Sequence, residues 1–224
     1  MSDQLIIIAR IRTDFPEKFG IPRQSGRIDA LKGTVIFMPE YKSPDAVKGL
    51  EGFSHIWLLW KVDVPPKENF QATVRPPRLG GNTPMGVFAT RSPFRPNPIG
   101  LSCVKLESVE FTKDGPVLHV SGVDMKNDTE ILDIKPYIPY TDCREDAIGG
   151  FADPLRDYHL DVSFPDNLLS KIPPEKREAL LAVLADDPRP SYQDDPDRLY
   201  GVSFAGFDIR FTVSDTTLTV REVQ

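Results

Sequence analysis

Short apolar runs, broken by proline and glycine, fill the first two thirds of the chain. Each run is predicted to be a β-strand because it is rich in β-branched and aromatic residues and is bounded by turn residues. The predicted strands are Leu5–Ile11, Gly33–Phe37, His55–Val62, Met85–Ala89, Leu101–Glu110 and Val117–Gly122. An open sheet of such strands would expose long edges, whereas closure removes them. The pattern therefore favours a closed β-barrel.

The last two predicted strands read as a hairpin. Asp114-Gly115 supplies the turn between them. The first of the two alternates apolar Leu101, Cys103, Val104 and Leu106 with polar Ser102, Lys105 and Glu107. Alternation of this kind indicates a strand with one buried face.

A second unit is predicted after the polar, glycine- and proline-containing stretch 141–154. It opens with a strand at His159–Phe164. A helix follows from Pro173-Pro174 to Ala185, because apolar residues recur there at helical spacing. Two strands, Gly201–Val213 and Thr217–Val223, end the unit. We expect a β-barrel domain over residues 1–150 and a small α+β domain over residues 151–224, so the fold class is mainly β and not Rossmann-type.

The composition is that of a globular protein, with 224 residues of which 40% are hydrophobic and 27% charged. Disordered, collagen-like and disulfide-stapled classes are excluded. The longest apolar runs, Leu5–Ala9 and Ile56–Trp60, are far shorter than the roughly 20 residues of a membrane helix. The N-terminal residues lack a basic region and cleavage site, and Cys103 and Cys143 form no ligand-spaced cluster. We therefore expect a soluble, cytoplasmic protein without a metal site.

Charge is distributed unevenly along the chain. Residues 1–110 hold 15 Lys and Arg against 11 Asp and Glu, whereas residues 111–224 hold 12 against 22. The segment 69–106 has no acidic residue, and its cations are Arg75, Arg78, Arg91, Arg95 and Lys105. An anionic partner would therefore bind the first half. A solvated basic loop is the more common explanation of such a run.

The motif with the highest density of proline and arginine is Thr90–Asn97, which reads TRSPFRPN. Proline fixes φ, so this loop holds Arg91, Arg95 and Asn97 rigidly. Guanidinium groups recognise phosphate or carboxylate through two parallel hydrogen bonds, which favours an anion-binding role. The alternative is a stiffened barrel corner whose arginines pair with the acidic second half.

Two further motifs carry chemistry. Residues 132–140 alternate in polarity so that Asp133 and Lys135 share one face, which suits a hydrogen-bond acceptor beside a cation. The alternative is an edge-strand salt bridge. Asp187-Pro188-Arg189-Pro190 precedes Tyr192, and an arginine near an aromatic ring suits an unpaired nucleotide. The alternative there is a linker that packs its tyrosine on the helix.

Other chemistries are excluded by what the chain lacks. Gly80-Gly81-Asn82 has neither the spacing nor the Lys-Ser/Thr ending of a phosphate-binding loop, and there is no Rossmann fingerprint. This argues against both a P-loop NTPase and a Rossmann-type methyltransferase. His55 is expected to be a satisfied strand histidine.

Taken in order, the proline- and arginine-containing motifs resemble the TrmO (TsaA-like) family of tRNA methyltransferases over nearly the whole chain. The motifs that carry the resemblance are Phe19–Gln24, Gly49–His55, Thr73–Arg78, Thr90–Asn97, Asp133–Tyr137 and Asp187–Pro190. The resemblance implies a β-barrel enzyme, working as a homodimer, that transfers a methyl group from S-adenosylmethionine to N6 of threonylcarbamoyladenosine at position 37 of threonine tRNA.

The resemblance also implies a set of cofactor contacts. They fall on Pro22, Arg23, Gln24, Asp63, Val64, Arg91, Leu101, Asn127, Asp128, Thr129 and Glu130. The family turn usually reads Asp-Gly-Thr-Pro where this chain has Asn127-Asp128-Thr129-Glu130. Asn and Asp tolerate turn conformations, so backbone contacts can survive the change.

The expected chemistry assigns roles to the remaining residues. Methyl transfer from a sulfonium is an in-line displacement, so the enzyme must align the reactants and exclude water. The substrate nitrogen belongs to a urea-like group, which a base would help to activate. We hypothesise that Asp133 is the acceptor and that Lys135 or Arg95, held with Asn97, binds the threonyl carboxylate or a phosphate. Tyr137 and Tyr192 would stack on bases, and Asp187 and Arg189 would act locally at the substrate.

Two other functions are compatible with the sequence. One is a noncatalytic RNA-binding or adaptor barrel that has kept the cofactor pocket, which the altered turn would favour. The other is a methyltransferase of the same architecture that acts on a different substrate.

Overall fold

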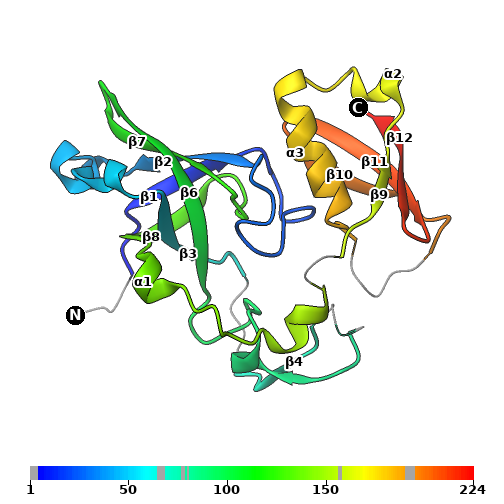
Figure 1. The fold of residues 1–224 in the computed structure, drawn as a ribbon, viewed down its shortest axis with the longest axis horizontal. Coiled ribbons are helices and arrows are strands. Elements are labelled where there is room, and N and C mark those ends of the chain that lie inside the picture. Colours follow the sequence, from blue (N-terminus) through cyan, green and yellow to red (C-terminus); the bar gives the residue numbers. More distant parts are fainter. Residues whose placement is uncertain (1–4, 65–68, 77–78, 80, 156–157, 190–194) are drawn as a thin grey trace.

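The computed structural model describes the chain except for residues 1–4, 65–68, 77–78, 80, 156–157 and 190–194. A β-barrel and a smaller sheet domain lie side by side (Figure 1). No helix among the described residues is long and apolar enough to cross a membrane.

The barrel consists of six antiparallel strands. They are β1 (Ala9–Thr13), β2 (Lys32–Phe37), β3 (His55–Lys61), β6 (Ile99–Thr112), β7 (Gly115–Ser121) and β8 (Thr129–Pro136). Their order is β1-β2-β7-β6-β3-β8, and the pairing of β8 with β1 closes the sheet. The expectation of a closed, mainly β fold is therefore confirmed. The barrel interior is filled by side chains such as Ile11, Ile56, Leu58, Val104 and Leu118, all fully buried.

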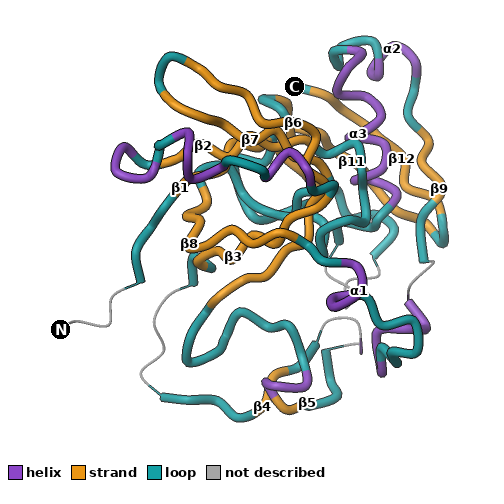
Figure 2. Tube along the Cα trace, turned by 60° about the vertical axis from the view of Figure 1, so that its left-hand side comes forward, coloured by secondary structure: helices purple, strands orange, loops and turns teal. Residues whose placement is uncertain are grey.

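The prediction of a strand at Met85–Ala89 is wrong in part. Only Met85–Gly86 is extended, as β5, and it pairs with β4 (Thr73–Val74) outside the barrel. A 3-10 helix over Val87–Ala89 follows at once. The sixth strand of the barrel is instead β8, which carries Asp133 and Lys135. It pairs with β1 on one side and β3 on the other, so these two residues do not lie on an edge strand. Figure 2 shows β4 and β5 apart from the barrel strands.

In β6, the side chains that face the barrel interior are not simply the apolar ones. Ser102, Val104 and Leu106 point inward and are buried, whereas Leu101 is 51% exposed. Ser102 can occupy an inward position because its hydroxyl is satisfied by two hydrogen bonds, described below.

The C-terminal domain packs one helix on a four-stranded sheet. Its elements are β9 (Asp161–Ser163), α2 (Asp166–Leu169), α3 (Pro174–Ala185), β10 (Tyr200–Phe204), β11 (Phe207–Ser214) and β12 (Thr217–Val223). The sheet order is β10-β11-β12-β9, with only β9 parallel to its neighbour. The helix α3 buries Ala179, Leu180, Val183 and Leu184 and lies over one face of the sheet in Figure 1. The predicted strand Gly201–Val213 is two strands, separated by a tight turn at Ala205-Gly206.

The remaining helices are short. The 3-10 helices Pro39–Tyr41, Pro44–Val47 and Leu50–Gly52 lie between β2 and β3. Helix α1 (Pro139–Asp142) and a 3-10 helix over Gly150–Leu155 lie between β8 and β9. The domain boundary near residue 150 stays a prediction.

The long β1–β2 loop, residues 14–31, joins the two domains. The rings of Phe15 and Phe204 meet edge to face with centroids 5.3 Å apart, and the Ala205 N–H donates to the Asp14 carbonyl at 2.8 Å. Lys176 on α3 forms an ion pair with Asp14 at 2.6 Å. At Gly20, an added Cβ would lie 2.1 Å from Val202 Cγ2. The loop is therefore packed tightly against the C-terminal domain.

Candidate functional site

One end of the barrel gathers the expected cofactor segments. Antiparallel pairing places the ends of β1, β3 and β7 beside the beginnings of β2, β6 and β8. The loops that leave this end include residues 14–31, 62–98 and 122–128. These loops or the adjoining strand ends contain Gln24, Asp63, Arg91, Leu101 and Asn127.

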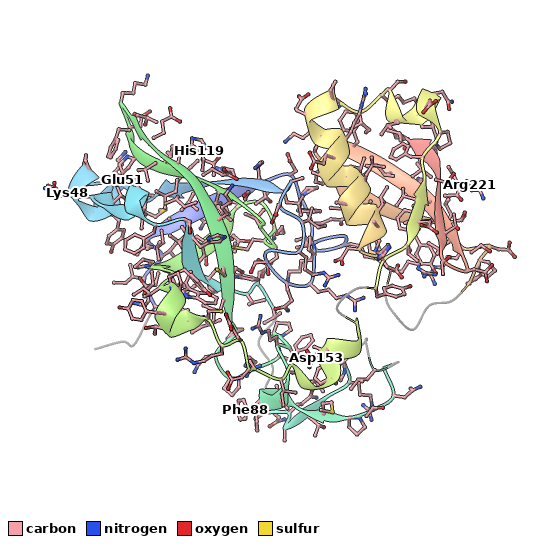
Figure 3. The ribbon with its side chains drawn as sticks, viewed as in Figure 1. Lys48, Glu51, Phe88, His119, Asp153 and Arg221 are labelled. Atoms are coloured by element: carbon pink, nitrogen blue, oxygen red, sulfur yellow. The ribbon has the colours of Figure 1, made fainter. Side chains whose placement is uncertain are left out.

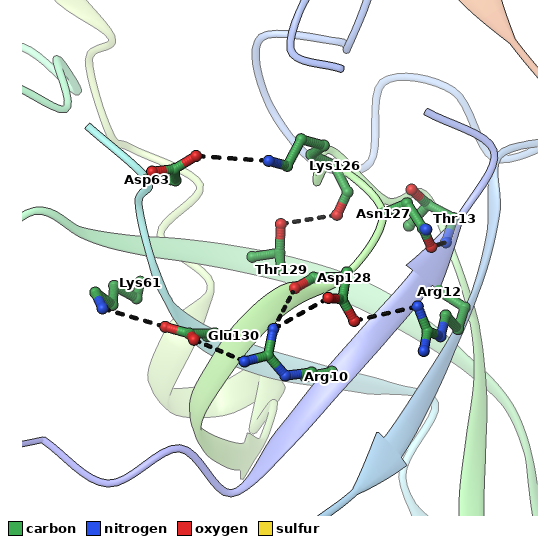
Figure 4. Close-up of polar contacts among 10 residues, drawn as sticks. All are labelled: Arg10, Arg12, Thr13, Lys61, Asp63, Lys126, Asn127, Asp128, Thr129 and Glu130. Carbon is green, nitrogen blue, oxygen red and sulfur yellow. Dashed lines mark hydrogen bonds and ion pairs between the residues drawn. The ribbon is translucent and has the colours of Figure 1, made fainter. Parts of the chain in front are cut away.

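The turn before β8 forms a charged cluster with β1 and β3 (Figure 4). Arg10 donates to the backbone carbonyl of Asp128 at 3.0 Å and pairs with the carboxylates of Asp128 and Glu130 at 3.2 and 2.8 Å. Arg12 also contacts Asp128, at 3.1 Å, and Lys61 contacts Glu130 at 3.2 Å. The two acidic residues that distinguish this turn from the family pattern are thus paired with cations.

Local hydrogen bonds fix the shape of this turn. The Thr13 N–H donates to Asn127 Oδ1 at 3.1 Å, and the Asn127 N–H donates to the Phe15 carbonyl at 2.7 Å. Asp128 adopts a left-handed backbone with φ of 67°. This is the conformation that glycine adopts most easily. The turn thus forms here without a glycine.

A cavity of about 290 Å³ opens between the turn and the end of β3. Its lining residues are Arg10, Lys61, Asp63, Lys126, Asn127, Asp128, Thr129 and Glu130. Asp63, which is 79% exposed, pairs with Lys126 at 3.5 Å and Lys18 at 3.8 Å. The volume is just below the usual range of ligand sites, about 300–1,000 Å³. Groups of both charge signs suit a zwitterionic ligand.

A second polar group lies at the mouth of the barrel. The indole N–H of Trp60 donates to Ser102 Oγ at 2.9 Å, and Ser102 donates to Asp124 Oδ1 at 2.6 Å. Burial raises the pKa of Asp124 to about 6, although Ser102, the Ser25 N–H and the charge of Arg91 act in the opposite direction. Arg91 donates to Gln24 Oε1. Two predicted cofactor residues are therefore in contact beside a carboxyl that titrates near neutrality.

Arg95, which is expected to bind an anion, makes contacts within its own loop. Arg95 donates to the carbonyls of Thr90 and Val87 at 2.7 and 3.2 Å, and it lies 5.5 Å from the ring centre of Phe88. Phe88 lies on the segment that carries β4 and β5 (Figure 3). Arg95 thus braces its own loop, whereas Asn97 is exposed.

The outer face of the barrel carries the predicted catalytic pair. Lys135 Nζ lies 2.8 Å from Asp133 Oδ2, so the two residues share one face as expected. In register, Asp133 pairs with Leu59 and Leu59 with Leu101, which places Leu101 in the same outward row. The pair Lys61–Glu130 of the cavity lies at the same face.

Tyr137 follows this strand beside two aromatic rings. Its ring centre lies 5.7 Å from that of Trp57 and 6.1 Å from that of His55. Burial raises the pKa of the Tyr137 phenol. The Trp57 indole donates to Asp142 at 3.0 Å, and Asp142 also accepts the Ile138 N–H at 2.8 Å. These contacts hold the segment after β8 against the barrel.

The Asp187–Arg189 motif lies at the domain junction. Arg189 forms two parallel hydrogen bonds with Asp187, at 2.9 and 3.0 Å, and these raise the pKa of its guanidinium. Its carbonyl accepts a hydrogen bond from Arg23 at 3.2 Å, and the Tyr158 hydroxyl donates to Asp187 at 3.1 Å. A predicted cofactor residue thereby touches a predicted substrate motif. Tyr192 lies outside the described residues.

Sequence reasoning missed Arg10, Lys61, Trp60, Ser102 and Asp124. One signal was present for Asp124, which is the only charged residue in the stretch 120–125 at the end of a buried strand. Arg10 and Lys61 lie at unremarkable strand positions, and only the register brings them to the turn. Among the described residues, no group of three His, Cys, Asp or Glu could hold a metal ion.

Comparison with known proteins gives consistent matches. Residues 10–143 match the family model of the tRNA-methyltransferase O N-terminal domain, and residues 157–224 match that of the TrmO C-terminal domain. The tRNA (adenine(37)-N6)-methyltransferase of Escherichia coli is 39% identical over 221 residues, which cover 95% of this chain and 94% of that protein.

Two further matches extend this result. A crystal structure of TrmO from Pseudomonas aeruginosa superimposes with a TM-score of 0.77 at 33% identity, over 100% of both chains. A Pyrococcus abyssi protein whose name describes S-adenosyl-L-methionine binding is 37% identical over 144 residues, covering 64% of this chain and 73% of that protein.

Proposed function

Because the chain belongs to the tRNA-methyltransferase O family, we propose that it is a methyltransferase that modifies N6 of adenine 37 in tRNA. The observation that carries the proposal is the match, over nearly the full length of both chains, to an Escherichia coli enzyme named for that reaction. The more specific proposal is that the substrate base is threonylcarbamoyladenosine in threonine tRNA and that the protein acts in the cytoplasm.

S-adenosylmethionine is the proposed methyl donor, since the relative from Pyrococcus abyssi is named for binding it. The charged cavity has groups that could hold this cofactor's amino-acid end: Arg10, Lys61 and Lys126 for a carboxylate and Asp63 for an ammonium. Each of them is paired with a neighbouring charge in this structure, so the cofactor would have to share or replace those pairs. Arg91 and Gln24 offer further polar contacts at the barrel mouth. When bound, S-adenosylmethionine supplies an electrophilic methyl group on a positively charged sulfur.

The protein residues would position the nucleophile. Asp133, at the outer face, would accept a hydrogen bond or the proton of the substrate nitrogen, and Lys135 would bind an anionic group of the modified base. Tyr137 offers a ring for stacking, with Asp187 and Arg189 acting from the domain junction. Arg95 and Asn97 would serve by shaping the arginine-rich loop.

A homodimer is part of the proposal. The outer face of β6 carries exposed Ile99 and Leu101, at 40% and 51%, and Tyr140 beyond β8 is 88% exposed. Large apolar side chains gathered on one face are typical of protein–protein contacts. Sedimentation equilibrium at micromolar concentration should give twice the mass of the chain, and a monomer would contradict this part of the proposal.

The activity is tested with purified protein, labelled S-adenosylmethionine and threonine tRNA, with or without threonylcarbamoylation, by mass spectrometry of the nucleosides. A methyl gain only on the threonylcarbamoylated tRNA is the expected result. Cofactor binding without methyl transfer would favour a different substrate, and no cofactor binding would favour the noncatalytic adaptor.

The role of Asp133 is tested by Asp133→Asn. General-base or acceptor catalysis contributes about 10² to 10⁴ in rate, so turnover should fall by at least about a hundredfold while cofactor affinity is unchanged. Full turnover in this variant would show that Asp133 is not the acceptor.

A further inference from the structure

Asp124 is the point at which several predicted cofactor segments meet. Ser102, which donates to its carboxyl at 2.6 Å, follows Leu101. A backbone hydrogen-bonding contribution from Ser25, the residue after Gln24, lowers the pKa of this carboxyl. The positive charge of Arg91 lowers the pKa of the same carboxyl. Asn127 comes three residues later in the same loop.

The loops around Asp124 are in close contact. The Gly26 N–H donates to the Gly122 carbonyl at 2.9 Å, and the Gly122 N–H donates to the Leu31 carbonyl at 2.9 Å. An added Cβ at Gly122, which has φ of 76°, would lie 3.3 Å from the backbone of Gly26. The backbone beside Ser25 is therefore held against the loop that carries Asp124, and these backbone contacts need no ligand to form.

The direction of the hydrogen bond from Ser102 is also fixed. Its oxygen accepts the indole N–H of Trp60, so its single proton is directed to Asp124. Besides Ser102, the groups that lower the pKa of this carboxyl are the backbones of Ser25 and of Asp124 itself and the charge of Arg91. All of them favour the ionised carboxylate, and burial opposes it.

We propose that Asp124 is a positioning residue for cofactor binding, whose carboxylate holds the segment before β2 through the Ser25 N–H and orients Arg91 toward Gln24. The inference rests on the proposed function, because it concerns the site for S-adenosylmethionine. It assigns a role to a residue that the family motifs do not include.

The proposal has a consequence for pH dependence. Its pKa of about 6 lets Asp124 lose its charge in mildly acidic solution. Protonation removes the anion that orients Arg91, so cofactor affinity should fall as the pH drops below about 6. Because one proton is involved, the limiting slope is about tenfold in affinity per pH unit.

The test is isothermal titration calorimetry of S-adenosylmethionine from pH 5 to pH 8 with four proteins. Wild type should show the acidic loss of affinity. Asp124→Asn should bind at least about tenfold more weakly at pH 8 and lack the step. Ser102→Ala keeps the carboxylate but loses a hydrogen bond that lowers its pKa, so its step should move to higher pH. Asp114→Asn, the same change in the exposed β6–β7 turn, should match wild type.

Several outcomes would overturn the inference. An Asp124→Asn protein with wild-type affinity and pH profile would show that the carboxylate does not position the site. If that variant does not fold, Ser102→Ala decides, since an unshifted step assigns the titration to another group. A wild-type protein that binds no S-adenosylmethionine at pH 8 would refute the proposed function, and the inference would fall with it.

Discussion

Asp128 occupies a left-handed turn position where the family pattern has glycine. For a residue with a Cβ this backbone costs about 1–2 kcal/mol, and Asp tolerates it better than most. Its carboxylate also pairs with Arg10 and Arg12. These ion pairs are partly exposed and therefore contribute little, about 0–1 kcal/mol. The turn therefore keeps its shape for two reasons: Asp tolerates the left-handed backbone, and its carboxylate forms weak ion pairs with Arg10 and Arg12.

Two substitutions of Asp128 should separate the effect of its backbone conformation on stability from the effect of its ion pairs. Asp128→Gly loses the ion pairs but relieves the backbone, so its free energy of unfolding should stay within about 1 kcal/mol of wild type. Asp128→Ala loses both advantages and should be about 1–2 kcal/mol less stable. Urea denaturation followed by circular dichroism measures both. Equal stability of the two variants would mean that the left-handed backbone is not retained in solution.

The raised pKa of Asp124 makes the stability of the protein depend on pH. An unfolded Asp has a pKa of about 3.9, so the folded state, at about 6, binds the proton more tightly. This contribution is fully present below pH 4 and is lost as the pH rises through 6. The stability of wild type relative to Asp124→Asn should therefore fall by up to about 3 kcal/mol from pH 4 to pH 7. A difference that grows with pH in denaturation experiments would contradict the assignment.

At the scale of elements, the turn between β10 and β11 shows a conflict between sequence and conformation. Both of its central residues, Ala205 and Gly206, have positive φ, at 52° and 84°. This is the conformation for which Asn-Gly is the favoured sequence in a hairpin. Alanine is strained in this left-handed conformation, so within Gly201–Val213 only Gly206 indicates the turn.

Ala205→Asn should therefore stabilise the protein. We expect a gain of about 1 kcal/mol in the free energy of unfolding, because Asn tolerates left-handed backbone and the N–H that donates to Asp14 is kept. The matched variant Gly206→Ala should lose about 1–2 kcal/mol. Thermal and urea unfolding report both, and a destabilised Ala205→Asn would mean that the turn is held by packing on the β1–β2 loop.

Five of the six barrel strands could be predicted from alternation and turn residues, with β8 the exception, but the faces and partners of the strands could not. Met85–Ala89 has strand-like residues, yet it forms only a two-residue ladder before a 3-10 helix, because no neighbouring strand extends it. Ser102 reads as a surface residue and is buried, because Trp60 and Asp124 satisfy it. Both outcomes depend on residues distant in the sequence.

The candidate site was predictable only where motifs mark it. Gln24, Arg91 and Asn127 could be named from the family resemblance, and the structure brings them to one end of the barrel. The hydrogen bonds of Arg95 to backbone carbonyls could not be predicted, because they depend on the path of the loop. The same holds for Asp124, because the burial of one carboxyl is set by how two loops pack.

At the scale of the whole molecule, the two domains are held together by a loop with close contacts. Arg27 pairs with Asp186 at 2.5 Å, with side chains only 23% and 11% exposed, and Lys176 pairs with Asp14. Partly buried pairs of this kind are costly to break on one side only. The Phe15–Phe204 contact adds an apolar centre.

A matched pair of glycine substitutions should measure this packing. Gly20 and Gly26 both have positive φ, at 86° and 71°, but only at Gly20 would a Cβ strike the other domain. In both Gly→Ala variants the strained backbone should lower the free energy of unfolding by about 1–2 kcal/mol. Gly20→Ala should lower it by about 1–3 kcal/mol more because of overpacking.

Val202→Ala provides the control for that comparison. It removes the methyl group that Gly20→Ala would strike, so the double variant should recover most of the extra loss, whereas combination with Gly26→Ala should be additive. Calorimetric unfolding gives these values. Additivity in both pairs would show that the loop and β10 are not in contact in solution.

Because the β1–β2 loop packs on the C-terminal domain, the two cannot be exchanged independently between relatives. A C-terminal domain transplanted from a relative would present a different surface to residues 14–31. Arg23 and Gln24, next to the proposed cofactor site, lie in that loop. Homologous recombination between relatives would therefore be expected to preserve function only when this loop and the C-terminal sheet are inherited from the same parent, although a whole barrel separates them along the gene.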